Sequence, residues 1–300
     1  MNYSFFFNHL SLSASGKDEA CSLLNDSFEG ARDLYLNGDG AFLCFDEENG
    51  DNYELTEGFT YGNFKSYLDN EDKELLSFIN ELEDKSPGID HLLQKHADKW
   101  SRHNSSYFKG RSGSNLRIFT IAEYEKGIML SLATEKFWVK NKIIFFSSIK
   151  GLHKPLQCEV YNISTREHSD IIDIKYNFPE AIFSGEFMNW YFRCKKEDRD
   201  KIKDKVIYCY KNDFQLRRPT IGYVNDSSFS NMKEIVVGPT HGQRGHIRIF
   251  FAMDSYRKAV ILYGFIKHSN DYTNHIRIAD EIFIEYNKML SEKPFNGTFI

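Results

Sequence analysis

The residues of this chain best suited to chemistry gather in one stretch, "RGHIRIFFAMDSYRKAVILYGFIKHSND", residues 244–271. It reads as two apolar strands joined by a tight turn, yet it carries Arg248 and ends on Lys267, His268 and Asn270. Arginine offers a planar fork of donors that suits a phosphate, and histidine exchanges protons near neutral pH. The stretch therefore indicates a site that binds an anion and moves protons, although an edge-strand arginine followed by a polar loop would explain the same residues.

Strand periodicity predicts which face of the sheet carries these groups. Because side chains alternate across a sheet, one face receives His246, Arg248, Phe250 and Ala252, and the other receives Ile247, Ile249, Phe251 and Met253. The second set is entirely apolar and predicts the core face, so Arg248 is expected on the opposite, functional face. In "MKEIVV", residues 232–237, the same alternation places Glu234 with Arg248 and Lys233 with the core set.

The elements that must position these residues form an α-α-β-β-β-α pattern with an antiparallel sheet. Residues 185–212 predict two helices, residues 232–237, 246–253 and 259–265 predict strands, and residues 273–290 predict a final helix with helical apolar spacing.

The preceding residues alternate between strand-like and helix-like segments, which gives an α+β fold class. Strands are expected over 2–12 and 157–164, helices over 16–36, 63–85 and 89–103, a hairpin around Asn49–Gly50, and strand or mixed structure over 115–135.

The charge distribution favours two domains, an acidic α+β domain over residues 1–175 and a second over 176–300. Residues 181–300 carry 19 Lys and Arg against 14 Asp and Glu, a net charge of +5, whereas the first 180 residues carry 19 against 29, a net charge of −10. The basic part is the one expected to meet a polyanion.

Several classes of site and protein are disfavoured. The five cysteines are scattered without a CxxC pair, so neither a zinc site nor a disulfide framework is expected, and a reducing cytoplasm is the natural location. His96 and His103 lack a third metal ligand. The sequence contains no run of about 18 apolar residues, so no membrane span is expected. The N-terminus lacks the basic residues of a signal peptide.

Five short motifs follow one another in the C-terminal third: "RRP" (217–219), "NMKEI" (231–235), "IRIFFAMD" (247–254), "RKAVILYGFIKH" (257–268) and "IADEIFIEYNKML" (278–290). In this order they resemble the RelE/HigB family of toxin ribonucleases, particularly its phage-derived HigB-like branch. The resemblance covers residues 183–290, and residues 1–180 show no comparable match.

The resemblance implies a small sheet with helices against one face and a concave, basic opposite face that holds mRNA, on its own or at the ribosome. It also implies chemistry without a metal or other cofactor, in which the 2′-hydroxyl attacks the phosphorus and the 5′-oxygen leaves. Cations must then stabilise the phosphorane, and other groups must move the protons.

Roles follow as hypotheses from that resemblance. Arg248 would hold the scissile phosphate, Lys267 would stabilise the transition state, and His268 or Tyr272 would transfer protons. Glu234 would be either the base or the residue that orients Arg248. Further RNA-binding residues would be Lys233, His246, His275, Arg217 and Arg218, the two arginines being equally suited to contact an antitoxin.

One position departs from the family. Relatives often have two lysines where this chain has Lys267 and His268, which would lower the activity or make it depend on pH. Family toxins are held by an antitoxin, commonly a helix-turn-helix protein, so one is expected here, with the N-terminal domain serving regulation or sensing in antiviral defence. The alternatives are a binding module that cleaves nothing, and an N-terminal enzyme that the C-terminal part targets.

Overall fold

The computed structural model describes residues 2–35, 40–46, 49–101, 103–108, 116–151, 154–215, 218–242, 244–268 and 273–291. Contacts between residues divide the chain into two compact units, Met1–Ile172 and Asp173–Ile300. The division falls inside helix α7 (Glu167–Asn177), which belongs partly to each unit. Among the described residues, no helix is long and apolar enough to cross a membrane.

The first unit is built on a six-stranded sheet with the order β2-β1-β6-β8-β7-β5. These strands are β1 (Asn2–Phe7), β2 (Gly40–Cys44), β5 (His103–Tyr107), β6 (Ile128–Leu130), β7 (Lys142–Ile149) and β8 (Leu156–Ile163). β1 is parallel to β2 and β6, and β6 is parallel to β8, whereas β7 is antiparallel to β8 and β5. Tyr3, Phe5, Phe6 and Phe7 are all buried because a central parallel strand is covered on both faces.

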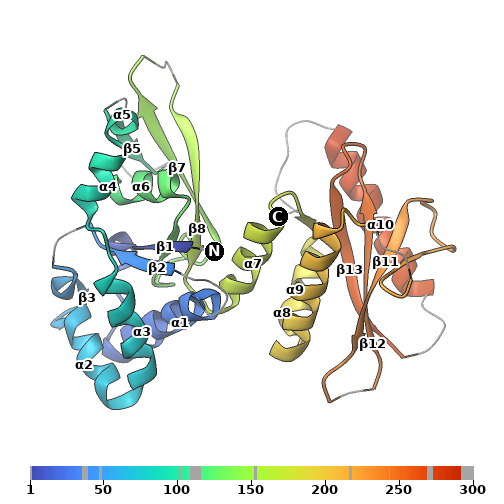
Figure 1. Cartoon of the computed structure of the whole chain (residues 1–300), viewed down its shortest axis with the longest axis horizontal. Coiled ribbons are helices and arrows are strands. Elements are labelled where there is room, and N and C mark those ends of the chain that lie inside the picture. The colour runs from blue at the N-terminus through green and yellow to red at the C-terminus, as the bar shows by residue number, and fades with distance from the viewer. Residues whose placement is uncertain are drawn as a thin grey trace. The chain divides into compact units, whose positions relative to one another are not determined.

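Helices surround this sheet (Figure 1). They are α1 (Lys17–Tyr35), α2 (Tyr61–Glu71), α3 (Lys73–Asp84), α4 (Ile89–Lys95), α5 (Ala97–Trp100) and α6 (Arg117–Glu125), with short 3-10 turns η1 (His9–Ser11) and η2 (Gly50–Asn52). The helix expected over 63–85 is interrupted at Asp72, whose side chain accepts a hydrogen bond from the Leu75 amide at 2.9 Å and begins α3.

One N-terminal prediction is wrong. The hairpin expected around Asn49–Gly50 does not form, because β2 pairs in parallel with β1 and β3 (Glu54–Thr56) pairs with β4 (Phe59–Thr60) instead. The stretch over 115–135, for which strand or mixed structure is expected, is mixed, since helix α6 is followed by β6. The apolar run of α6 is buried almost all round, which removes the periodicity by which a helix is recognised.

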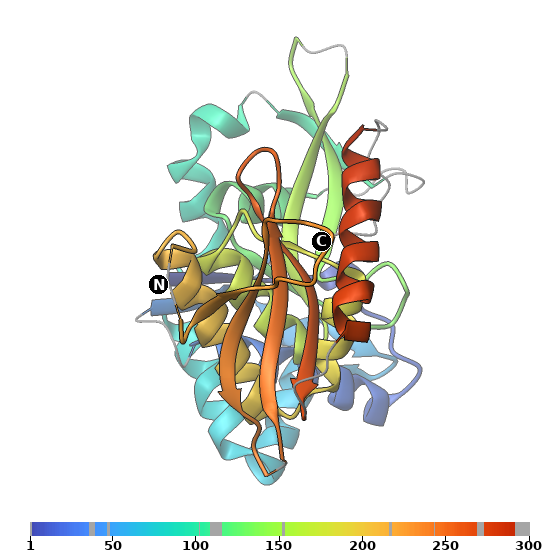
Figure 2. The ribbon, with the colours of Figure 1, turned by 90° about the vertical axis from the view of Figure 1, so that its right-hand side faces the viewer.

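The second unit carries the α-α-β-β-β-α pattern that the sequence predicts. Its elements are β9 (Ile182–Phe183), α8 (Gly185–Arg193), α9 (Lys196–Lys211), β10 (Ile221–Tyr223), β11 (Met232–Pro239), β12 (His246–Met253), β13 (Ala259–Lys267) and α10 (Thr273–Ser291). The sheet order is β10-β11-β12-β13-β9, antiparallel except where β9 joins β13. Figure 2 shows β11, β12 and β13 side by side, with α10 alongside them.

Helices lie on both sides of this sheet (Figure 1). On one face Phe251 contacts Phe214 with ring centroids 5.0 Å apart, and α8 packs so closely that a Cβ built on Gly264 would lie 2.0 Å from Trp190 Cζ3. On the other face α10 covers Phe250 and Ala252, which are fully buried. The expectation that the whole Arg248 face is an open concavity is therefore wrong, since the apolar cluster under α10 covers Phe250 and Ala252 and reaches Phe265, which stands opposite Arg248.

Candidate functional site

The strand register assembles the site around Arg248. Arg248 stands opposite Val236 on β11 and Phe265 on β13, and its neighbour two residues away, Phe250, stands opposite Glu234 and Tyr263. Directly opposed residues share a face, so Glu234 and Arg248 lie on the same face, as the alternation predicts. Lys233 stands opposite Phe251 and belongs to the other face.

A β-bulge in β13 controls this arrangement. The register shifts between Phe250, opposite Tyr263, and Phe251, opposite Ile261, so Leu262 is an extra residue. Beyond the bulge, Phe265 and Lys267 stand opposite Arg248 and His246. Lys267 is therefore a diagonal neighbour of Arg248 on the same face.

Arg248 is half-buried and poorly satisfied. Its Nε and Nη1 atoms are shielded from solvent and find no hydrogen-bond partner among the described residues. An arginine cannot lose its charge to avoid the cost of burial, and its buried donors remain available to an anion. A phosphate, which the guanidinium fork binds through two parallel hydrogen bonds, fits this arrangement.

Glu234, opposite Phe250 on β11, is a diagonal neighbour of Arg248 and is only 8% exposed. Its Oε2 atom is buried without a partner among the described residues. A Cβ built on Gly222, the residue opposite Glu234 on β10, would lie 3.1 Å from Glu234 Oε1 and 3.6 Å from Arg218 Nε. Glu234 and Arg218 thus converge over Gly222, and the carboxylate lies on the side of the site where it can orient cationic side chains.

His275, in the first turn of α10, packs onto the same part of the sheet. Its imidazole stacks on Phe265, with centroids 4.3 Å apart and an interplanar angle of 18°, and on Tyr263 at 5.7 Å. Its Nδ1 atom is buried without a partner among the described residues. Burial lowers the pKa of His275 by disfavouring the charged imidazolium, which favours the neutral, proton-accepting form.

The remaining predicted residues lie at one end of β12 and β13, beside β10, or outside the residues that the structure describes. Lys267 and the exposed His246 face each other at one end of β12 and β13, and exposed His268 follows, its Nδ1 lying 3.1 Å from a Cβ built on Gly245. Arg218 and Lys233 line a hollow of ≈ 680 Å³ beside β10. Tyr272 and Arg217 lie outside the described residues.

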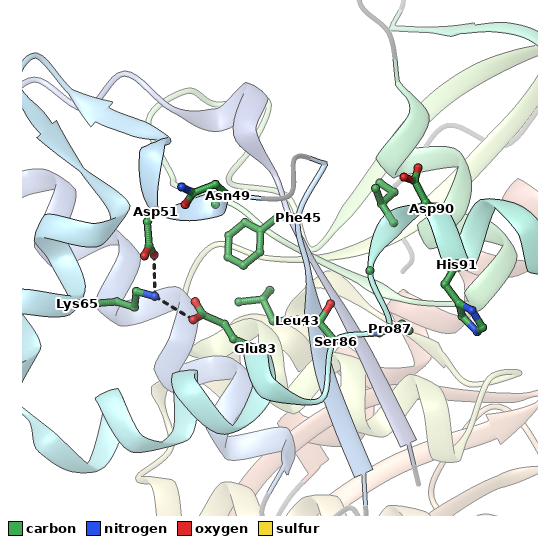
Figure 3. Close-up of a pocket in the computed structure, with 13 residues that line it drawn as sticks. Leu43, Phe45, Asn49, Asp51, Lys65, Glu83, Ser86, Pro87, Asp90 and His91 are labelled. Carbon is green, nitrogen blue, oxygen red and sulfur yellow. Dashed lines mark hydrogen bonds and ion pairs between the residues drawn. The ribbon is translucent and has the colours of Figure 1, made fainter.

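The first unit has its own hollow, of ≈ 440 Å³, beside the end of β2 (Figure 3). Lys65 bridges Asp51 at 2.6 Å and Glu83 at 2.9 Å, and Tyr61 donates to Glu83 at 2.8 Å. Asp90 also lines it, so three carboxylates stand against one lysine among the described lining residues. This excess of negative charge is unsuited to a polyanion, in contrast to the surroundings of Arg248.

Sequence comparisons single out the same part of the chain. The model of the family described as phage-derived, Gp49-like proteins matches residues 190–283, a span that contains Glu234, Arg248, Lys267 and His275. A Mycobacterium tuberculosis (strain ATCC 25618 / H37Rv) protein named as toxin HigB3 is 35% identical over 104 residues, which are 34% of this chain and 87% of that protein. No solved structure matches the chain.

Proposed function

Because the C-terminal part of this chain belongs to the phage-derived, Gp49-like family of HigB-type toxins, we propose that it is a toxin-type endoribonuclease that cleaves mRNA. The single observation that supports cleavage best is Arg248, whose buried Nε and Nη1 atoms find no partner among the described residues. Glu234 and His275 flank it with further buried, unpartnered atoms. Such groups in one place suit a charged ligand whose negative charge grows during the reaction.

The proposed reaction is an internal transfer at phosphorus. The 2′-hydroxyl loses its proton to neutral His275 while its oxygen attacks the scissile phosphate, and the bond from phosphorus to the 5′-oxygen breaks. A 2′,3′-cyclic phosphate forms, and the 5′-oxygen leaves as a hydroxyl after receiving a proton from His268 or Tyr272. Arg248 and Lys267 stabilise the charge on the phosphorane, and Glu234 orients Arg248.

The roles of His275 and Glu234 refine the hypotheses drawn from the sequence. His275 is proposed there as an RNA-binding residue, but its stack on Phe265, directly opposite Arg248, favours a role in proton transfer. Glu234 approaches Gly222 and Arg218, which favours a role in orienting cationic side chains over that of the base.

The test is a map of mRNA 5′ ends after a brief pulse of expression of the full chain. Wild type is expected to create new ends, and Arg248→Ala is expected to lower their yield on the order of a hundred-fold or more, as loss of a transition-state donor does. Ends in phase with codons would establish cleavage at the ribosome, and ends without phase would establish cleavage of free RNA.

The variant must be shown to fold, which the thermal midpoint of the purified protein measures. Arg248→Ala removes a half-buried charge without described partners, so the midpoint is expected to stay the same or rise. New ends of equal yield in both strains would contradict the proposal.

A non-catalytic binding module is the second candidate, and the replacement of a family lysine by His268 favours it. It predicts co-sedimentation with ribosomes, or capture of one protein partner, without new mRNA ends in either strain. We further propose that a cognate antitoxin of the helix-turn-helix type binds this chain, as for other toxins of this family. For the acidic first unit we propose a regulatory or sensing role.

A further inference from the structure

The hollow beside β10 lies at the outer edge of the second sheet. β10 is its outermost strand on that side, and the hollow is lined by Phe214, Gln215, Arg218, Ile221, Gly222, Tyr223, Asn225 and Lys233. Its volume of ≈ 680 Å³ is within the range of sites that take small organic groups.

The lining combines the three kinds of group that single-stranded RNA requires. Arg218 and Lys233 supply positive charge, and no carboxylate is among the lining residues that the structure describes. The amides of Gln215 and Asn225 can pair with the edge of a base. Tyr223 is 67% exposed, and Lys233 Nζ lies 5.4 Å from the centre of its ring. An exposed aromatic ring beside cations is the usual platform on which a base stacks.

The hollow is connected to the proposed cleavage site through Arg218. This arginine lines the hollow and also approaches Gly222 beside Glu234, which shares the face of Arg248. β10 is two strands away from β12, about 10 Å. Tyr223 and Lys233 point to the opposite face from Arg248, so the RNA must pass over the edge strand to reach both places.

We propose that this hollow is a subsite for one nucleotide of the single-stranded substrate, next to the cleaved phosphate. Its base stacks on Tyr223, its base edge meets Gln215 and Asn225, and its phosphate lies between Arg218 and Lys233. The inference rests on the proposed function for the identity of the substrate, and it adds a base contact that sets which nucleotide stands beside the cut.

The test is equilibrium binding of fluorescein-labelled eight-nucleotide RNAs, oligo-A and oligo-U, by fluorescence anisotropy. The full chain carries Arg248→Ala so that the RNA stays intact. Adding Tyr223→Ala is expected to weaken binding roughly five- to a hundred-fold, the effect of losing one stacked base. Tyr256→Ala, at a tyrosine that is 73% exposed in the turn after β12, is the matched control and is expected to leave binding unchanged.

A second variant separates stacking from charge. Lys233→Gln is expected to weaken oligo-A and oligo-U equally and to reduce the slope of log affinity against log salt by about one, as loss of one phosphate contact does. An unchanged slope would contradict a phosphate between Lys233 and Arg218.

The outcomes for the subsite and for the nuclease are distinguishable. Weaker binding by Tyr223→Ala, without mRNA cleavage by wild type, would keep the subsite and overturn the nuclease. Cleavage by wild type, with Tyr223→Ala and Tyr256→Ala binding equally well, would overturn the subsite alone. Failure of the full chain carrying Arg248→Ala to bind either RNA would overturn the subsite. The subsite would also be overturned if Tyr223→Ala weakened the capture of a protein partner and left RNA binding unchanged.

Discussion

Arg248 buries two polar atoms that no described residue satisfies, and Glu234 and His275 bury one each. Leaving such an atom unsatisfied costs about 1–3 kcal/mol, and the four atoms belong to two residues on one face of the sheet and to His275, which packs on that face. Proteins retain this kind of cost where a ligand relieves it or where a reaction uses it. The shared location of the three groups therefore supports a common function better than any one of them does alone.

At the residue scale, the pH dependence of cleavage tests the role of His275. Its pKa is lowered by burial from the ordinary value of 6.5, so the neutral base is retained below that pH. The acid limb of the rate profile is expected below pH 6.5, and His275→Gln should remove that limb and slow cleavage about 10²- to 10⁴-fold. Single-turnover cleavage of a labelled mRNA, measured from pH 5 to 8, provides the profile.

Stability must be followed in the same buffers, because the same shift affects folding. The folded-state pKa is lower than the unfolded one, so the unfolded chain binds the proton more readily and stability falls as the pH drops below 6.5. His275→Gln abolishes this contribution. An acid limb that survives in the variant, in protein that remains folded, would exclude His275 as the base.

At the scale of elements, a substitution where α8 contacts β13 tests how closely the second unit is packed. A Cβ on Gly264 would lie 2.0 Å from Trp190 Cζ3, part of a rigid ring. Gly264→Ala is expected to lower the free energy of unfolding by about 1–3 kcal/mol or more through overpacking, measured by urea denaturation. Combining it with Trp190→Leu should recover part of that loss; equal losses with and without Trp190 would contradict the contact.

The helices and three long strands of the second unit could be predicted because each has enough residues to show a period. Ile276, Ala279, Ile282, Phe283 and Tyr286 are buried on α10 at the expected spacing. The strands β9 and β10, of two and three residues, are too short to show alternation. The hollow beside β10 was missed for that reason, although the tyrosine and the cations around it are visible in the sequence.

Parts of the site could likewise be predicted, and the resemblance to HigB-type toxins is confirmed by the matches to this part of the chain. Alternation alone placed Arg248 with Glu234 and separated Lys233 from them. It could not reveal that α10 covers the far end of the same face, because both faces of β12 carry apolar residues there. Nor could it place His275 on Phe265, since that contact joins a helix to a strand.

At the scale of the whole molecule, each unit has an apolar core of its own. In the second unit, Lys203 pairs with Asp173 at 3.0 Å and ties α7 to α9. A fragment of residues 165–300, which keeps all of α7, is therefore expected to unfold cooperatively when its circular dichroism is followed during heating.

The charges of the two parts predict how this fragment binds RNA. It carries 21 basic and 18 acidic residues, a net charge of +3, and the removed part carries 17 and 25, a net charge of −8. With Arg248→Ala in both proteins, the fragment is expected to bind oligo-U about three- to ten-fold more tightly than the full chain at 50 mM salt. The difference should vanish near 1 M salt, where screening acts within about 3 Å; a difference that persists there would contradict a long-range electrostatic cause.

The extra residue of β13, Leu262, determines which side chains of this strand reach the proposed site. If Leu262 were paired with Phe250 in an unbroken ladder, Gly264 would stand opposite Arg248, and Phe265 and Lys267 would turn to the other side of the sheet. The bulge therefore sets which residues of β13 face Arg248, although the same residues would be present in either register. In the evolution of such chains, loss of the codon for Leu262 would straighten the strand without moving the site, whereas a codon lost elsewhere in β13 would keep the register of the site only if the strand gave up its bulge.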